Sequence, residues 1–129
     1  MIISYAYDIV NAMRRMKEGG SVKFYKHLYI GDTVNNPAKI KRKLKLHAGV
    51  QVFVITIAQG ADQLEIYHSA YLKQKYYRYH PPVIVGLASD YKEALQIVLK
   101  ITEECVSLTG NCNLKEYLKQ KAKTNGVGK

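Results

Sequence analysis

The chain has 129 residues, 47% of them hydrophobic and 23% charged, a composition typical of one globular domain that buries its own core. Twenty Lys and Arg face ten Asp and Glu, so the net charge is +10 and an anionic partner is favoured. No apolar run approaches the length of a membrane-spanning helix, and the first residues lack the pattern of a signal peptide. We therefore expect a cytoplasmic protein without membrane association, with a single domain over residues 1–122 and a disordered tail over 123–129.

Apolar residues recur at helical spacing over residues 2–16, which predicts an N-terminal amphipathic helix. Residues 21–30, SVKFYKHLYI, then alternate apolar and polar side chains with the period of a strand. Lys26 interrupts the apolar side of this alternation, and this indicates either an edge strand or a strand with one end near solvent.

The segment GDTVNNPAKIKRKLKLHAG carries the start and stop signals of a helix. Asn36 suits the N-cap, Pro37 suits the first helical position, and Gly49 suits the left-handed position after the last turn. The pattern predicts a helix over residues 37–48.

Three further segments have the pattern of strands. Residues 50–58 and 82–88 are almost continuously apolar and β-branched, as in strands covered on both faces. Residues 63–70 alternate and follow a four-residue turn, so they are expected to form a hairpin with residues 50–58.

The C-terminal part of the chain predicts two helices. Ser89 or Asp90 is expected to cap a long helix that ends at Gly110. Asn113 and Glu116 form a capping-box pattern at the start of a short helix.

The predicted order is α-β-α-β-β-(short α)-β-α-α, which indicates an α/β (α+β) sandwich of two or three layers on a four-stranded mixed sheet. We expect the first two strands and the helix between them to form a parallel β-α-β unit. The order also fits a ferredoxin-like split β-α-β fold if residues 70–79 serve as the second crossover.

The predicted helix at residues 37–48 is the first candidate for an anion-binding site. Five cations surround its narrow apolar stripe and leave little other polar surface, and like charges four residues apart repel one another. An anionic partner would relieve this repulsion, whereas the alternative is a solvated helix face with no partner. The five are Lys39, Lys41, Arg42, Lys43 and Lys45.

The second candidate is residues 71–82, YLKQKYYRYHPP, in which tyrosines alternate with cations. This composition is typical of surfaces that stack on single-stranded bases and pair with phosphates. Helical spacing favours instead a short amphipathic helix whose tyrosines pack in the core or in a homodimer interface. In the nucleic-acid interpretation Tyr77 stacks on a base, and the phosphate contacts come from Lys73, Lys75 and Arg78.

Catalytic signals are weak. His68 and His80 could serve as the acid and base of a metal-independent ribonuclease only if the two rings converge. Cys105 and Cys112 have no metal-ligand spacing, and no phosphate-binding loop or nucleophile motif is present, so no metal, cofactor or small-molecule substrate is expected. Gly86 and Ser89 would permit an anion to approach the start of the long helix, but Asp90 adds a negative charge there, and the alternative is an ordinary strand-to-helix connection.

These observations favour a non-enzymatic basic domain that binds an anionic partner, with RNA or DNA contacted through phosphates as the leading hypothesis. The first alternative is a protein-interaction module or homodimer whose tyrosine-rich segment is the interface. The ribonuclease with a histidine pair is the third.

Overall fold

A computed structural model of the chain describes residues 22–46, 49–58, 63–73 and 80–123. The helix predicted over residues 2–16 and the turn at 59–62 lie outside these ranges, as does the expected tail apart from Lys123, which ends the last helix. The elements are β1 (Lys23–Ile30), α2 (Pro37–Lys45), β2 (Phe53–Ile57), β3 (Leu64–His68), the 3-10 helix η1 (Ser69–Lys73), β4 (Val83–Ala88), α4 (Tyr91–Thr109) and α5 (Leu114–Lys123).

The four strands form one mixed sheet in the order β1-β4-β2-β3. β1 runs parallel to β4, whereas β4 and β3 are both antiparallel to β2. The predicted α+β sandwich with a four-stranded mixed sheet is therefore confirmed, as are the hairpin of β2 and β3 and the edge position of β1. The two nearly continuous apolar segments became the central strands β2 and β4, because only central strands are covered on both faces.

The expectation of a parallel β-α-β unit from the first two strands is wrong. Because β1 is parallel to β4 and β4 is antiparallel to β2, β1 and β2 run in opposite directions on either side of β4. The ferredoxin-like arrangement requires its first two strands to be parallel, so it does not describe this sheet. Side-chain alternation specifies which face of a strand is buried, but it carries no information on strand direction or order.

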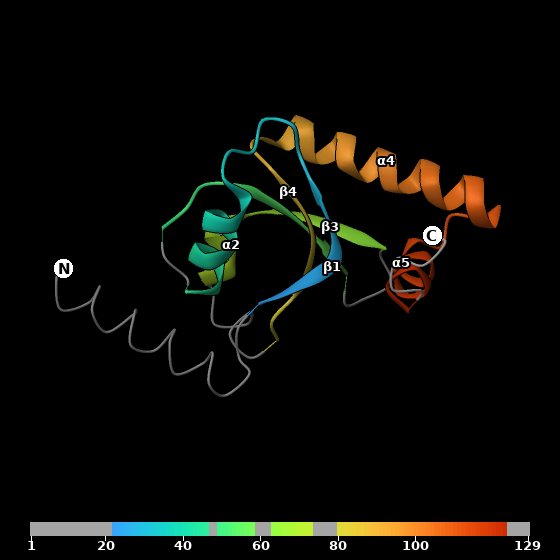
Figure 1. Cartoon of the computed structure of the whole chain (residues 1–129), viewed down its shortest axis with the longest axis horizontal. Helices are drawn as coiled ribbons and strands as arrows, with labels where there is room; N and C mark the ends of the chain where they lie inside the picture. The colour runs from blue at the N-terminus through green and yellow to red at the C-terminus, as the bar shows by residue number, and fades with distance from the viewer. Residues whose placement is uncertain (1–21, 47–48, 59–62, 74–79, 124–129) are drawn as a thin grey trace, which may run out of the picture.

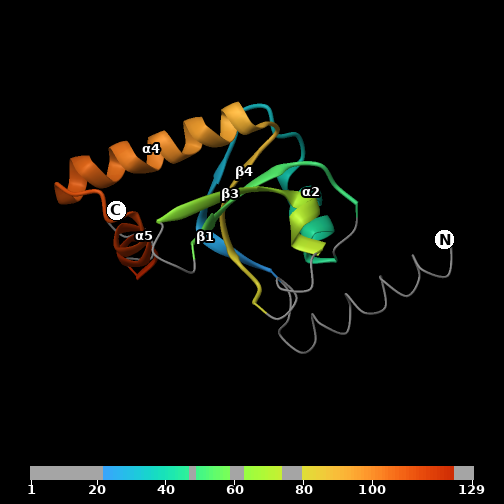
Figure 2. The ribbon, with the colours of Figure 1, turned by 180° about the vertical axis from the view of Figure 1, so that it is seen from behind.

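Helices cover both faces of the sheet, which gives three layers (Figure 1). α4 and α5 lie on one face, and α2 and η1 lie on the other, as the view from behind also shows (Figure 2). Each face has its own core: Ile55, Val85 and Ile101 are buried on the α4–α5 side, and Leu44, Ile84 and Leu72 on the α2–η1 side.

Local capping chemistry places most of the helix ends. The Asn36 side chain accepts a hydrogen bond from the Lys39 amide at the start of α2, and Asp90 caps α4 in the same way through the Glu93 amide. Gly110 ends α4 with a φ of 78°, a left-handed conformation that glycine adopts without strain. α2 ends at Lys45 with Leu46 as its C-cap, short of the predicted end at residue 48.

Gly86 allows α4 to approach the sheet closely. A Cβ atom at this position would lie 3.0 Å from Ile55 Cδ1 and 3.1 Å from Ile97 Cγ2. β4 also has an irregular register with β2 here, since Ile55 pairs with Gly86 while Thr56 pairs with Ile84. Among the described helices, none combines the length and hydropathy required to cross a bilayer.

Candidate anion-binding surface

The cations of α2 lie on the sides of the helix that its apolar stripe leaves free. Leu44 is buried and Ile40 half-buried against the sheet, so the narrow apolar stripe predicted from the sequence is the side that packs. The remaining positions carry the cations. Lys39, Arg42 and Lys45 are exposed, and Lys41 and Lys43 are half-buried.

An aromatic ring on the neighbouring strand holds two of these lysines. Lys41 Nζ lies 5.4 Å and Lys45 Nζ 5.7 Å from the centre of the Phe24 ring on β1. Both distances are within the range of cation–π attraction, which limits the freedom of the two ammonium groups and links α2 to the edge strand. No local pattern in the sequence connects Phe24 with a helix some seventeen residues later.

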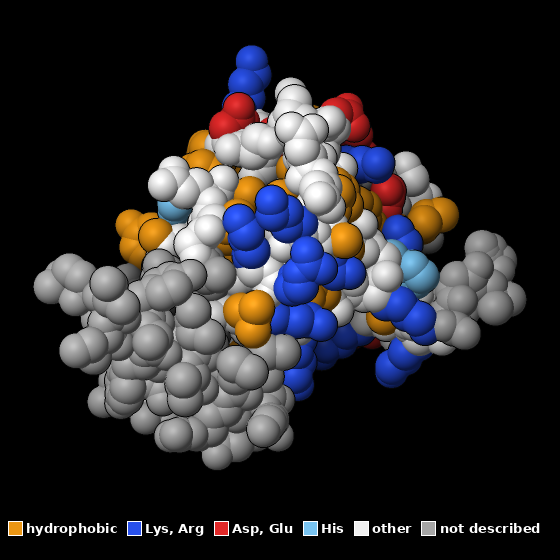
Figure 3. Space-filling model, turned by 60° about the vertical axis from the view of Figure 1, so that its left-hand side comes forward, with side chains coloured by type: hydrophobic (Ala, Val, Ile, Leu, Met, Phe, Trp, Pro, Cys, Tyr) orange, Lys and Arg blue, Asp and Glu red, His pale blue; other side chains and the backbone are white. Residues whose placement is uncertain are grey.

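The edge strand adds Lys23 and Lys26, both exposed. We call the five cations of α2 together with these two lysines the basic surface. Residues 22–46 contain these seven cations and one acid, Asp32, whereas residues 89–123 contain six lysines and five acids. The side of the molecule that carries α2 accordingly shows Lys and Arg gathered around hydrophobic side chains (Figure 3). Among the described residues, the positive charge is therefore concentrated in the segment that forms β1 and α2.

The tyrosine-rich segment is only partly described. Its first residues form η1, in which Leu72 is buried and Tyr71 is 52% exposed, so Tyr71 does not pack in the core as helical spacing suggested. Lys73 ends η1. The Lys73 side chain and residues Lys75, Tyr77 and Arg78 lie outside the described part of the chain.

His68 and His80 do not converge. His68 ends β3 and pairs with Phe53, which on its other side pairs with Ala88 at the end of β4. His80 precedes the start of β4, where the Pro82 carbonyl binds the Lys23 amide. The two histidines are therefore at opposite ends of the sheet, separated by the length of β4, about 16 Å. His68 Nδ1 instead accepts a hydrogen bond from the Ala70 amide.

The strand-to-helix junction after Gly86 is occupied by the chain's own carboxylate. Glu93 Oε1 accepts hydrogen bonds from the Ser89 amide (2.8 Å) and the Thr33 hydroxyl (2.8 Å), and Oε2 accepts one from the Thr33 amide (3.0 Å). Burial alone would raise the pKa of Glu93, but these hydrogen bonds outweigh it and the pKa is lowered. We call this set the Glu93 junction. It joins the loop after β1 to the start of α4 and takes the place of an external anion.

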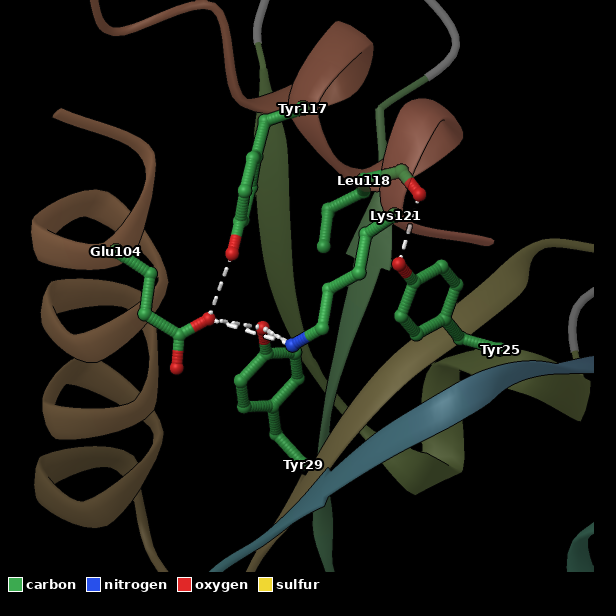
Figure 4. A network of polar contacts seen from close by, with 6 residues as sticks. All are labelled: Tyr25, Tyr29, Glu104, Tyr117, Leu118 and Lys121. Atoms are coloured by element: carbon green, nitrogen blue, oxygen red, sulfur yellow. Dashed lines mark hydrogen bonds and ion pairs between the residues drawn. The ribbon is translucent and has the colours of Figure 1, made fainter. Parts of the chain in front are cut away.

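A second polar cluster lies between β1, α4 and α5, and we call it the Glu104 network (Figure 4). Glu104 Oε1 accepts hydrogen bonds from the hydroxyls of Tyr29 (2.6 Å) and Tyr117 (3.0 Å). Lys121 Nζ lies 3.4 Å from the same oxygen and 2.9 Å from the Tyr29 hydroxyl. Beside this cluster the Tyr25 hydroxyl donates to the Leu118 carbonyl over 2.7 Å, so two tyrosines of the edge strand hold α5.

The environment of these tyrosines is unsuited to nucleophilic chemistry. Burial, followed by the charge of Glu104, raises the pKa of Tyr25 to about 12. Burial and the bond to Glu104 raise the pKa of Tyr117 to about 12 and that of Tyr29 further. Burial would also raise the pKa of Glu104, but hydrogen bonds from Tyr29 and Tyr117 and the charge of Lys121 lower it. The phenols therefore remain protonated donors, Tyr29 and Tyr117 to the Glu104 carboxylate and Tyr25 to the Leu118 carbonyl, and their role is structural.

We expect Tyr29→Phe to lower the free energy of unfolding by about 1–2 kcal/mol at neutral pH, since it removes a hydrogen bond to a charged acceptor. Wild-type stability should also fall above about pH 10, because tyrosines ionise near 10 in the unfolded chain but at higher pH in this network. Urea unfolding at several pH values measures both effects. Tyr71→Phe, at an exposed tyrosine, is the control, and an equal loss in both variants would contradict the network's role.

The structure thus defines an α+β sandwich with one strongly basic side and two internal polar clusters. Among the described residues, no group of three His, Cys, Asp or Glu side chains is placed to hold a metal ion. Comparison of the chain with protein-family models, with curated proteins and with solved structures gave no match.

Proposed function

We propose that the protein binds an anionic polymer, with RNA or DNA as the leading partner, through the basic surface of α2 and β1. The observation that carries this proposal is the density of cations in the segment that forms β1 and α2: residues 22–46 contain seven cations and one acid, whereas residues 89–123 contain six lysines and five acids. Such a surface attracts a polyanion whose binding releases condensed counterions. The expected contacts are to phosphates, so sequence preference should be weak.

The arrangement of the lysines supports a binding role over a merely solvated helix face. Lys39 and Lys43, like Lys41 and Lys45, are four residues apart on α2, a spacing at which like charges destabilise a helix. Lys41 and Lys45 nevertheless converge over Phe24. The fold thus keeps these cations close together despite their mutual repulsion. Phosphate binding would offset that unfavourable energy.

Insertion into a lipid surface is disfavoured by the orientation of α2. An interfacial helix buries its apolar side among the lipids. The apolar side of α2, with Ile40 and Leu44, already packs on the sheet and is not available for a bilayer. A soluble polyanion requires only the outward cations, which the structure leaves at the surface.

The test is fluorescence anisotropy with labelled single-stranded RNA, duplex DNA and heparin, each titrated with salt. We expect the triple variant Lys39→Gln/Arg42→Gln/Lys43→Gln to weaken nucleic-acid binding at least about tenfold. The slope of log K against log salt should fall by roughly two to three, about one for each phosphate that no longer meets a cation.

The matched control is Lys100→Gln/Lys119→Gln/Lys123→Gln, which removes the same charge from exposed positions on α4 and α5. The affinity of this control variant for nucleic acid should change by less than about twofold. Equal losses in the two triple variants would show that only net charge matters and would contradict a localised site. Heparin binding as tight as RNA or DNA binding at physiological salt would contradict nucleic acid as the particular partner.

A further inference from the structure

One flank of α4 carries apolar side chains that remain largely exposed. Along this helix the exposed large hydrophobic side chains include Tyr91, Leu95, Leu99 and Val106. At about 100° per residue these four fall within one stripe, beside the side that packs on the sheet. The Phe53 ring of β2 contacts Tyr91 edge to face at 6.0 Å, so the stripe continues onto the sheet.

Two opposite charges flank this stripe in a symmetric way. Lys92 and Glu103 are both exposed and eleven residues apart, which is three helical turns, so they lie on the same side of α4. Their midpoint lies between residues 97 and 98, and the midpoint of Leu95 and Leu99 is residue 97. The stripe and its charges therefore share one centre.

We infer that α4 packs antiparallel against α4 of a second copy of this chain to form a two-fold dimer. Antiparallel packing about the shared centre places Lys92 of each copy opposite Glu103 of the other, whereas parallel packing would place like charges together. Leu95 and Leu99 of both copies then meet at the axis. Charge complementarity thus selects a second copy of the same helix as the partner of this apolar stripe.

The proposed dimer is independent of nucleic-acid binding, because α4 and α2 cover opposite faces of the sheet (Figure 1). Pairing through α4 leaves α2 uncovered in both copies. Such a dimer could hold two segments of a polyanion at once.

Sedimentation of the full chain without nucleic acid tests the inference. We expect a species of about twice the 14.7 kDa chain mass at tens of micromolar, and Leu99→Glu should convert it to monomer. Leu108→Glu is the matched control, because Leu108 is an exposed leucine of the same helix, 73% accessible and half a turn away from Leu99. Circular dichroism verifies that both variants are folded.

Charge exchange provides a second readout that does not disturb the leucines. Lys92→Glu and Glu103→Lys should each raise the dimer Kd about tenfold, since each turns two attractive pairs into repulsive ones. The double variant K92E/E103K should restore the homodimer, and the two single variants should form a heterodimer when mixed. A monomeric wild type, a dimer unaffected by Leu99→Glu, or single charge variants that do not combine would each overturn the proposal.

Discussion

Replacing Glu93 with alanine is expected to lower the free energy of unfolding by about 2–4 kcal/mol, with a fall in Tm of roughly 10 °C. The Glu93 side chain accepts three hydrogen bonds from Ser89 and Thr33, and the residue is only 9% exposed. Its removal leaves two backbone amides and a hydroxyl without their acceptor at the point where the loop after β1 meets α4. Thermal and urea unfolding measure the loss.

The loss should depend on pH in a definite direction. Because the folded-state pKa of Glu93 is lowered, its contribution is fully present above the unfolded-state pKa, about 4.3, and disappears as the pH falls through the folded-state value. The difference between wild type and Glu93→Ala should therefore be greatest at neutral pH and shrink in acid. Lys100→Ala, at an exposed position on the same helix, is the control and should change stability by less than about 0.5 kcal/mol.

Gly31→Ala provides an independent test of the Glu93 junction. A Cβ atom on Gly31 would lie 2.3 Å from Glu93 Cδ, so the carboxylate must leave its position. We expect Gly31→Ala to lower the free energy of unfolding strongly in the wild-type background. The loss should be much smaller in the Glu93→Ala background, where the space is vacant. Additive effects of the two substitutions would contradict this account, because residues that compete for one space are coupled.

The second large effect is expected for Leu118→Ala, which should lower the free energy of unfolding by about 3 kcal/mol. Leu118 is fully buried in the core between α4, α5 and the sheet, and truncation of such a leucine leaves a cavity. α5 has ten residues, too few for a helix that is stable in isolation, so its stability comes from packing. Release of α5 should also weaken the bond from the Tyr25 hydroxyl to the Leu118 carbonyl.

Urea unfolding measures the global cost of Leu118→Ala, and hydrogen exchange measures the local one. In the Leu118→Ala variant, the increase in exchange rate over the wild type should be larger for the amides of α5 than for those of β2 and β4. Lys119→Ala, at the adjacent exposed position, should leave both quantities within about 0.5 kcal/mol of wild type. Uniformly faster exchange throughout the protein would contradict a local role for this side chain.

Local chemistry determined the elements and most of their ends. Asn36, Asp90 and Asn113 cap helices through amides three residues away, and Gly110 ends α4 in the conformation that its lack of a side chain permits. Lys26 indicated an edge strand or a strand end near solvent, since a charge within a strand pattern is tolerated only where water is near. These signals act over a few residues, so the sequence alone contains them. The cations of α2 were found for the same reason: a helix whose apolar stripe packs must expose its other sides.

Only the tertiary structure decided which distant residues meet. The strand order, the opposite directions of β1 and β2, and the separation of His68 from His80 depend on long-range pairing that alternation does not encode. Of the chain's eleven tyrosines, Tyr25 and Tyr29 are buried under α5 while Tyr71 is exposed, a difference set by the packing of α5. The Glu93 junction joins residues 60 positions apart, and the bond of Tyr25 to Leu118 spans 93. Such contacts form because the packed layers bring buried polar groups within reach of the partners that they require, and the separation in sequence leaves no local signal of them.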